Sequence, residues 1–313
     1  MQLGRTIIFQ PSTPRMPPKT VQDEHLELTP RQVAEAIGIS ESSLKRWCDR
    51  GALPSRRTLG GHRRIPVAGV LRFVRERQFV LRNPSILGLP SGLRQRAAAP
   101  EALYQQLLDN LTDGHGDDVR RLGIEAFVTS SSLAPLFDDI LTPALHEIGR
   151  RWQRGTLEIF RERRAVTTIR ALLGDLRRLL VVPEAGGAKA IGATLAGDHY
   201  EVAVHMGDLV LADVGWQTQT IGSNVPIDSV RVAVESARPS LLWLSLSHVP
   251  DVETFVSDYE GLYERAVELG IAVAVGGAAL TGELRSRIKA TAFGSSMVEL
   301  AELGRGLLPR QKS

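Results

Sequence analysis

Apolar positions divide the chain into three stretches with different periodicities. Between residues 27 and 79 they mark short amphipathic helices, and between residues 101 and 184 they recur every three to four residues. From residue 188 to residue 313, strand-like apolar runs alternate with helical ones. A helical period buries one helix face, whereas alternating strands and helices form a parallel sheet. The pattern therefore predicts a multidomain protein.

The first stretch predicts helix, turn, helix, hairpin and helix, in that order. Thr29 followed by proline is typical of a helix start, and Gly38 should end this first helix. A second helix over about residues 41–50 is followed by two short arms around Gly60 and Gly61, a dipeptide that tolerates the positive φ of a hairpin turn. This order predicts an N-terminal winged helix-turn-helix domain over residues 27–79.

Basic residues are concentrated in the same stretch. The chain carries a formal net charge of +3, but residues 31–82 hold twelve Lys and Arg against four Asp and Glu. A local basic surface is expected where one domain contacts nucleic acid, although a solvated basic face is the alternative. Helix residues would reach bases in the major groove, and wing arginines would follow the phosphates. The candidate DNA-binding residues are Ser42, Ser43, Lys45, Arg46, Arg50, Arg56, Arg57, Gly61, His62, Arg63 and Arg64.

The segment LTPRQVAEAIGISESSLKRWCDRGALPSRRTLGGHRRI resembles the winged-helix DNA-binding domain of MerR-type and excisionase-type regulators. The shared pattern is RW…G.LP…R…GGHRR, within residues 27–78. The resemblance implies binding to double-stranded operator DNA. Because one small head makes few base contacts, self-association into a dimer or tetramer is expected.

The second stretch predicts a four-helix bundle. Residues 80–100 are rich in proline and glycine and predict a linker, and residues 1–26 predict a flexible tail. Residues 101–184 then follow a 3.6-residue period with short breaks, as expected for four antiparallel helices.

Within this stretch, LTPALHEIGRRWQRGTLEIFRER places Trp152 and Glu162 around a bend between two helices. The segment resembles the helical cap of cobalamin-binding modules, as found in methionine synthase and in light-sensing regulators of the CarH and LitR type. The shared pattern is LxEIGxxWxxG followed by a glutamate. In the photoreceptors a histidine commonly follows that glutamate, whereas this chain has Arg163. Alternatively, Trp152 is only a core residue of the bundle.

The third stretch predicts five strands alternating with five helices, a flavodoxin-like doubly wound α/β domain over residues 188–313. A ligand in such a sheet binds beyond the carboxyl ends of the strands. The loops at those ends are residues 197–201, 245–251 and 276–280.

These loops are similar to those of the cobalamin-binding fold. In that family the first loop reads D-x-H-x-x-G, and its histidine binds cobalt from below while the nucleotide tail enters a slot lined by serine and paired glycines. This chain has the acid at Asp198 but a tyrosine at Tyr200, where the ligand histidine should stand. The resemblance implies that the cofactor-binding residues are Trp152, Glu162, Arg163, Asp198, His199, Tyr200, Ser245, Ser247, Gly276 and Gly277.

Arg163 and Tyr200 stand where the related photoreceptors have histidines, which leaves three hypotheses for the third stretch. The domain binds cobalamin by shape and polar contacts alone, binds a different flat or charged ligand, or has lost ligand binding and mediates oligomerisation, with a partner protein as the signal. The histidines show no HxxH or HExxH spacing, so no catalytic metal site is expected.

The remaining features predict a cytoplasmic protein. A single cysteine, Cys48, excludes an intramolecular disulfide framework, and no apolar run approaches the ~18 residues of a membrane span. No G-x-S-x-G elbow indicates a serine hydrolase. The sequence therefore predicts a non-enzymatic transcriptional regulator, by resemblance a repressor. The alternative is a corrinoid methyl-transfer protein, which the DNA-binding head and Tyr200 disfavour.

Overall fold

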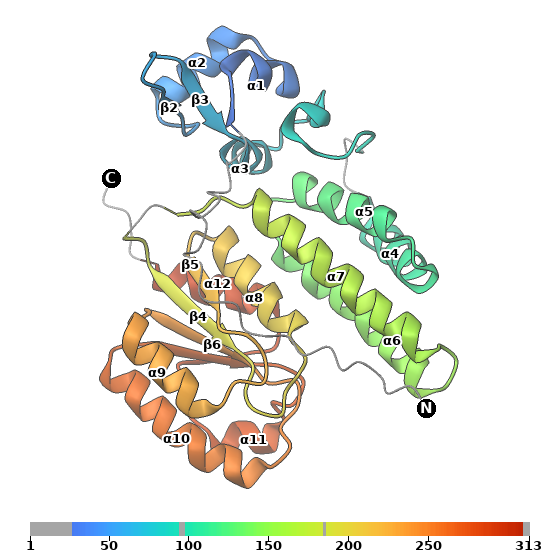
Figure 1. Ribbon diagram of the computed structural model, residues 1–313, viewed down its shortest axis with the longest axis vertical. Coiled ribbons are helices and arrows are strands. Elements are labelled where there is room, and N and C mark those ends of the chain that lie inside the picture. Colours follow the sequence, from blue (N-terminus) through green and yellow to red (C-terminus); the bar gives the residue numbers. More distant parts are fainter. Residues whose placement is uncertain (1–26, 94–97, 184–185, 309–313) are drawn as a thin grey trace, which may run out of the picture.

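The computed structural model describes residues 27–93, 98–183 and 186–308. The head (residues 27–79) packs against the end of a helical layer, which in turn covers one side of an α/β domain (Figure 1). The tail expected over residues 1–26 and part of the expected linker lie outside the described residues.

The head contains three helices and a three-stranded antiparallel sheet of order β1-β3-β2. The Thr29 hydroxyl accepts from the backbone N–H of Gln32, whose side chain accepts from Thr29 in return, and Gly38 ends the first helix at φ 81°. Both predicted ends of that helix are therefore confirmed. The elements are β1 (Glu27–Leu28), α1 (Pro30–Ile37), α2 (Glu41–Asp49), β2 (Arg56–Arg57), β3 (Arg63–Pro66) and α3 (Val67–Arg77).

The hairpin between β2 and β3 closes through backbone hydrogen bonds. The N–H of Thr58 donates to the carbonyl of His62, and the N–H of Gly61 donates to the carbonyl of Thr58. Gly61 adopts φ 77°, a conformation that favours glycine. The expected wing is thus a short two-stranded arm.

Part of the expected linker packs on the head. A short 3-10 helix, η1 (Pro84–Leu87), follows α3, and Leu81, Leu87 and Leu89 are buried. The N–H groups of Arg82 and Asn83 both donate to the carbonyl of Ala36. These leucines bury apolar surface that the composition of the segment does not reveal.

The helical layer comprises α4 (Pro100–Asp113), α5 (Gly116–Thr129), the π-helical segment η2 (Leu136–Leu141), α6 (Thr142–Gln153) and α7 (Ile159–Leu179). The segment η2 runs directly into α6, and Pro143, which has no N–H to donate, lies in the first turn of α6. A proline at this place favours the wide turn that precedes it. The division into four regular helices stays a prediction.

The α/β domain has a five-stranded parallel sheet of order β5-β4-β6-β7-β8, as the alternating pattern predicts. Helices α8 and α12 cover one face, and α9, α10 and α11 cover the other. The strands are β4 (Lys189–Ala193), β5 (Gln217–Thr220), β6 (Leu241–Ser245), β7 (Ala272–Gly276) and β8 (Ala292–Gly294); the helices are α8 (Val202–Asp213), α9 (Ile227–Ala237), α10 (Val252–Glu268), α11 (Gly282–Arg287) and α12 (Met297–Leu307).

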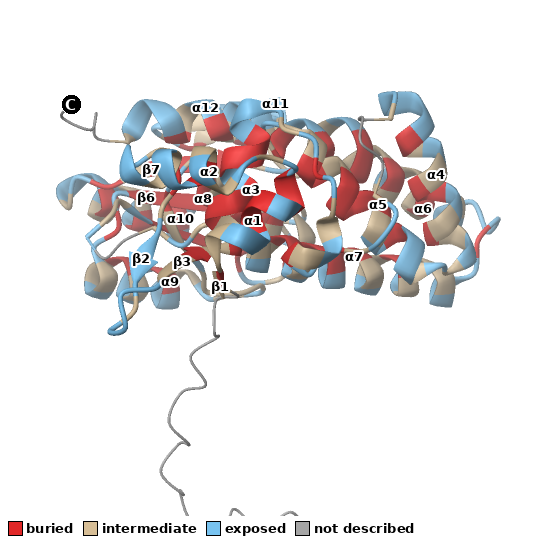
Figure 2. Ribbon diagram, turned by 90° about the horizontal axis from the view of Figure 1, so that it is seen from above, coloured by how far each residue is buried: buried red, intermediate tan, exposed pale blue. Residues whose placement is uncertain are grey.

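One continuous apolar core runs from the head through the helical layer to α8 and α12. Helices α3, α5 and α8 each contribute buried residues to it (Figure 2). An ion pair crosses this core: Arg75 of α3 donates to both carboxylate oxygens of Asp213 on α8, at 2.6 and 3.0 Å. Only 4% and 9% of the two side chains are exposed. None of the described helices has the length and apolar character needed to cross a membrane.

Candidate functional site

The basic face of the head begins on α2. Ser40 caps this helix by accepting from the N–H of Ser43, and Leu44 is turned into the core. Lys45 pairs with Glu41 at 2.7 Å, one helical turn earlier. The remaining exposed residues of the helix and its C-cap are Ser42, Arg46, Asp49 and Arg50.

The four wing arginines divide into two pairs. Arg56 donates twice to the carboxylate of Glu27, and Arg63 donates to the carboxylate of Asp49 and to the carbonyl of Lys45. These carboxylates raise the pKa of both guanidinium groups by hydrogen bonding. Both arginines therefore fasten the wing to the rest of the head.

The guanidinium groups of the other two wing arginines are available. Within the residues that the structure describes, Arg57 and Arg64 make no ion pair, and Arg64 lies opposite Arg56 across the β2–β3 ladder. Gly61 and His62 are exposed at the end of the arm. Of the expected DNA-binding residues, five already have internal side-chain partners: Ser42, Ser43, Lys45, Arg56 and Arg63.

The sequence did not predict that Arg56 and Arg63 pair with carboxylates elsewhere in the head. Asp49 lies 14 positions before Arg63, and Glu27 lies 29 positions before Arg56. A charge pattern along one helix identifies pairs three or four residues apart, but it says nothing about a strand that folds back. Only the hairpin brings these charges together.

In the α/β domain, Asp198 connects two of the loops at the carboxyl ends of the strands. Its buried carboxylate accepts from the N–H groups of Tyr200 at 3.0 Å, Ser247 at 2.6 Å and His248 at 3.2 Å. Ionised carboxylates are stabilised by backbone donors arranged in this way. Asp198 thus orders the loops after β4 and β6.

His199 and Tyr200 are exposed, Tyr200 to 60%. A helix that began here would separate the two side chains by roughly 100°. This helical separation does not apply, because α8 begins only at Val202 and both residues lie in the preceding loop.

Ser245 and the paired glycines lie where two strands end. A Cβ on Gly276 would come within 2.8 Å of the Gly294 carbonyl oxygen, and a Cβ on Gly277, at φ 115°, would come within 2.4 Å of that of Leu246. Ser245 is buried beside them at the end of β6. Close approach of neighbouring backbone therefore accounts for both glycines without a ligand.

The helical layer contributes the residues around the α6–α7 bend. Trp152 is 38% exposed, and Glu162 is 12% exposed with a buried carboxylate oxygen, Oε2, that lacks a hydrogen-bond partner. Arg163 Nε approaches this oxygen to 3.3 Å, but the geometry is not that of a hydrogen bond. A buried acceptor without a partner is uncommon and indicates a place for a ligand or water.

Arg163 faces the same side as the loop after β4. Two turns further along α7, Arg170 forms an ion pair with Glu201 at 2.8 Å. Residues seven positions apart lie on one helix face. Arg163 and the loop that carries Tyr200 therefore border the same side of α7.

A cobalt ion with a protein histidine below it does not fit this arrangement. The side chain at the expected position is the phenol of Tyr200, and the nearby acid, Asp198, is engaged by three backbone donors. Among the described residues, no group of three or more His, Cys, Asp and Glu could hold a metal ion.

Comparisons with known proteins identify two domain families. Residues 27–78 match the family model of a helix-turn-helix domain, and residues 103–177 match that of a B12 binding domain. The second match covers the helical layer.

Two repressors are similar over most of the chain. It is 26% identical over 238 residues to the HTH-type transcriptional repressor CarA of Myxococcus xanthus, covering 74% of this chain and 80% of that protein. It is 26% identical over 265 residues to the HTH-type transcriptional repressor CarH of the same organism, covering 79% and 87%.

Corrinoid proteins share the C-terminal part. Trimethylamine corrinoid protein 1 of Methanosarcina acetivorans is 20% identical over 215 residues, which is 67% of this chain and 99% of that protein. The solved monomethylamine corrinoid protein of Methanosarcina barkeri aligns with a TM-score of 0.55 at 15% identity over 67% of this chain and 100% of its own, which shows the fold. This chain therefore joins a helix-turn-helix domain to a B12-binding domain and is similar to the transcriptional repressors CarA and CarH.

Proposed function

We propose that this protein is a DNA-binding transcriptional repressor without enzymatic activity. The observation that carries the proposal is the basic face of the head, where Arg46, Arg50, Arg57 and Arg64 make no ion pair within the described residues. Unpaired arginines on a helix and an adjacent wing are suited to base edges and phosphates. The similarity to two repressors supports the same function.

The test is selection of binding sites from a pool of random DNA duplexes by the full chain. We expect a sequence motif to be enriched, because α2 presents arginines to the major groove. The Arg46→Ala, Arg50→Ala double variant should enrich no motif, whereas Arg56→Ala, which alters an arginine already paired with Glu27, should enrich the same motif as the wild type. Failure of the wild type to enrich any duplex contradicts the proposal.

We infer that the C-terminal half controls assembly of the repressor, with a ligand held by contacts other than a histidine ligand. The exposed Trp152 and Tyr200 and the buried carboxylate oxygen of Glu162 support a ligand between the helical layer and the loop after β4. If the ligand is cobalamin, it would supply a broad flat surface with polar substituents, and these residues would hold it through stacking and hydrogen bonds. A ligand that prefers one domain arrangement would change the DNA affinity by linkage.

A second candidate is a C-terminal half that mediates assembly without any ligand and responds to a partner protein. The backbone contacts around Gly276 and Gly277 favour it, because the close approach of neighbouring backbone accounts for both glycines without a nucleotide tail. Absorbance of the protein after incubation with adenosylcobalamin and desalting distinguishes the two. A retained corrin spectrum supports the cobalamin-binding candidate, and a protein without it eliminates that candidate.

A further inference from the structure

One large apolar side chain of the head belongs to no core. Leu59, at the tip of the arm between β2 and β3, has a relative exposure of 112%, whereas the next most exposed large apolar residue among those described is Val232 on α9, at 63%. Figure 2 shows the arm beside β2 extending beyond the rest of the head, with exposed residues at its end. No described residue covers Leu59, so the packing of the head does not require it.

The turn at the tip does not require a leucine either. The N–H of Gly61 donates to the carbonyl of Thr58 at 2.8 Å, which places Leu59 and Gly60 at the two central positions of a tight turn. Gly61 has φ 77°, and neither Leu59 nor Gly60 has a positive φ. The first central position of such a turn accepts most residues. A polar side chain at position 59 would close the same hairpin without exposing apolar surface.

The arm holds this side chain in a defined position relative to α2. Arg63 donates to the carboxylate of Asp49 and to the carbonyl of Lys45, both on α2. Leu59 lies two residues beyond Arg57, which stands opposite Arg63 in the ladder. At the usual rise of a strand, the tip is about 7 Å further out than this point of attachment. Leu59 therefore projects past the end of α2 on a braced support.

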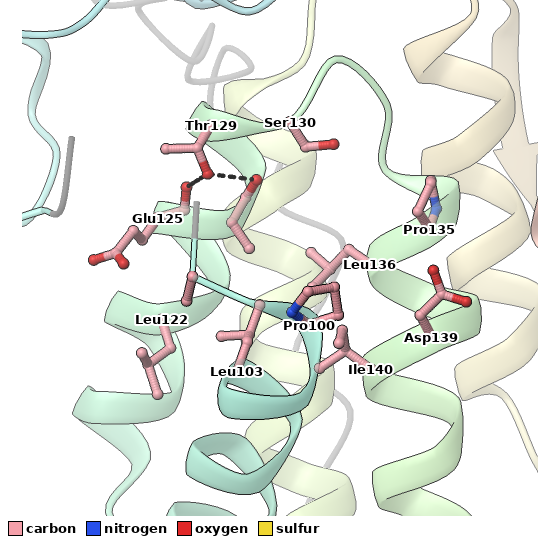
Figure 3. Close-up of a pocket in the computed structure, with 12 residues that line it drawn as sticks. Pro100, Leu103, Leu122, Glu125, Thr129, Ser130, Pro135, Leu136, Asp139 and Ile140 are labelled. Carbon is pink, nitrogen blue, oxygen red and sulfur yellow. Dashed lines mark hydrogen bonds between the residues drawn. The ribbon is translucent and has the colours of Figure 1, made fainter. Parts of the chain in front are cut away.

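The rest of the protein approaches the head from another side. Helix α3 docks on the helical layer, where Arg75 donates to the carbonyl of Ser130 at 2.9 Å and its guanidinium lies 4.1 Å from the centre of the Phe127 ring. Ser130 follows α5 and lines a cavity of about 140 Å³ within that layer (Figure 3). In Figure 1 the arm and α2 lie on the outer side of the head, away from α5 and α7. The docked head therefore leaves α2 and the tip accessible together.

The two arginines of the arm that make no ion pair in the described chain lie on opposite faces of its ribbon. Arg57 stands opposite Arg63 in the ladder, and Arg64 stands opposite Arg56. Residues opposite each other share a face, whereas successive residues alternate. Arg57 and Arg64 are therefore on different faces, with Leu59 ahead of both. Cations on both faces and an apolar tip fit a groove that has a phosphate strand on each side.

The minor groove of DNA has this form. It is about 6 Å wide and about 7.5 Å deep, and a phosphate strand borders each side. Its floor presents only acceptors at A·T pairs, whereas a G·C pair adds the amino group of guanine, a donor. An apolar side chain at the floor leaves that donor without an acceptor and without water. Leucine and similar residues are used as apolar wedges by other proteins that bind this groove.

We propose that Leu59 enters the minor groove beside the site contacted by α2 and selects against guanine there. Arg57 and Arg64 contact the phosphates on the two sides of the groove, and Leu59 lies against the floor at A·T pairs. Leu59 is thus a specificity-determining residue that detects the absence of one amino group. The inference rests on the proposed DNA-binding function and adds to it the groove and the base pair that the arm recognises.

Two alternating duplexes test the proposal. Inosine–cytosine pairs present the major-groove groups of guanine–cytosine pairs but lack the amino group in the minor groove. We expect the full chain to bind the inosine–cytosine duplex about fivefold more tightly than the guanine–cytosine duplex, a factor at the lower end of the cost of an unpaired buried donor. Fluorescence anisotropy at several salt concentrations measures both affinities.

Leu59→Ala should bind the inosine–cytosine duplex about fivefold more weakly and should lose the preference between the duplexes, because it removes the apolar contact. Its slope of log affinity against log salt concentration should stay unchanged, since an apolar contact releases no counterion. Leu59→Met, which retains a long apolar side chain, should keep the preference. Val232→Ala, which shortens an exposed apolar side chain on α9, is the matched control and should change neither quantity.

Three results overturn the role of Leu59 while the proposed function stands. The first is equal binding of both duplexes by the wild type. The second is a preference that Leu59→Ala retains, which would assign the discrimination to the arginines of the arm. The third is a lower salt slope in Leu59→Ala, which would indicate a displaced arm. A wild type that binds neither duplex contradicts the proposed function, and the role of Leu59 with it.

Discussion

Arginines of the head have two different roles although they follow one another closely in the sequence. Arg56 and Arg63 hold the wing to Glu27 and Asp49, whereas Arg57 and Arg64 keep their guanidinium groups available. A paired arginine must lose its carboxylate before it binds a phosphate, so the unpaired arginines are the stronger candidates for DNA contacts.

We predict that the Arg57→Ala, Arg64→Ala double variant weakens binding to duplexes of any sequence. Each lost phosphate contact lowers the slope of log affinity against log salt concentration by about 0.9, so the slope should fall by about two. Fluorescence anisotropy with a random-sequence duplex at several salt concentrations measures it. Arg56→Ala is the matched control, and an equal loss of slope there would contradict the division of roles.

Tyr200 is the residue on which the ligand question depends. We predict that Tyr200→His gains retention of cobalamin, since the backbone N–H of residue 200 is already held by Asp198 and the new imidazole would occupy the exposed position. The absorbance spectrum after desalting is the measurement, with Tyr200→Phe as the control. If Tyr200→His retains no corrin, the space beside Gly276 and Gly277 is closed to the nucleotide tail.

At the scale of elements, a residue of the helical layer caps a helix of the α/β domain. Asp138 of η2 accepts from the N–H groups of Met297 and Val298 at 2.8 and 2.9 Å, and so caps α12 across the boundary between the helical layer and the α/β domain. A carboxylate at a helix start satisfies free N–H groups and interacts favourably with the helix dipole.

We predict that Asp138→Ala lowers the free energy of unfolding by about 1–2 kcal/mol, the usual effect of a lost helix cap. Asp139→Ala is a closely matched control, because the neighbouring carboxylate is exposed and caps no helix. Urea denaturation followed by circular dichroism compares the two. Equal destabilisation by both substitutions would show that the cap contributes nothing of its own.

The sequence predicted these elements better than it predicted their contacts. Gly38, Gly61 and the alternating pattern after residue 188 mark helix ends, the hairpin and the parallel sheet, because each depends on local geometry or on burial of one face. The packing of Leu81 and Leu87 on the head depends on a surface distant in the sequence, and proline and glycine there indicated only a linker. The candidate pocket could not be predicted for the same reason. The carboxylate of Asp198 accepts hydrogen bonds from a loop about 50 residues later in the chain.

At the scale of the whole molecule, the buried pair of Arg75 and Asp213 joins the head to the α/β domain through the loop at Ser130. The two residues are 138 positions apart, and neither stands in a recognisable motif. Burial makes removal of one partner costly, because the other charge loses its compensation in a poorly hydrated place.

We predict that Asp213→Ala lowers the free energy of unfolding by about 3–5 kcal/mol. The Arg75→Met, Asp213→Leu double variant should recover much of this loss, since it removes both charges and retains apolar volume. Thermal and urea denaturation of the two variants and the wild type provide the comparison. A double variant that is less stable than Asp213→Ala would indicate that the hydrogen bond from Arg75 to Ser130 dominates.

The same ion pair bears on how such a regulator can acquire a new specificity. Helix α3 belongs to the head by its chain position, but its inner face is shaped to Phe127 of α5 and to Asp213 of α8. A head transplanted from another regulator without an arginine at position 75 would leave Asp213 buried and uncompensated. Exchange of DNA-binding heads by recombination is therefore constrained at this position, and substitutions at residues 75 and 213 are expected to occur together.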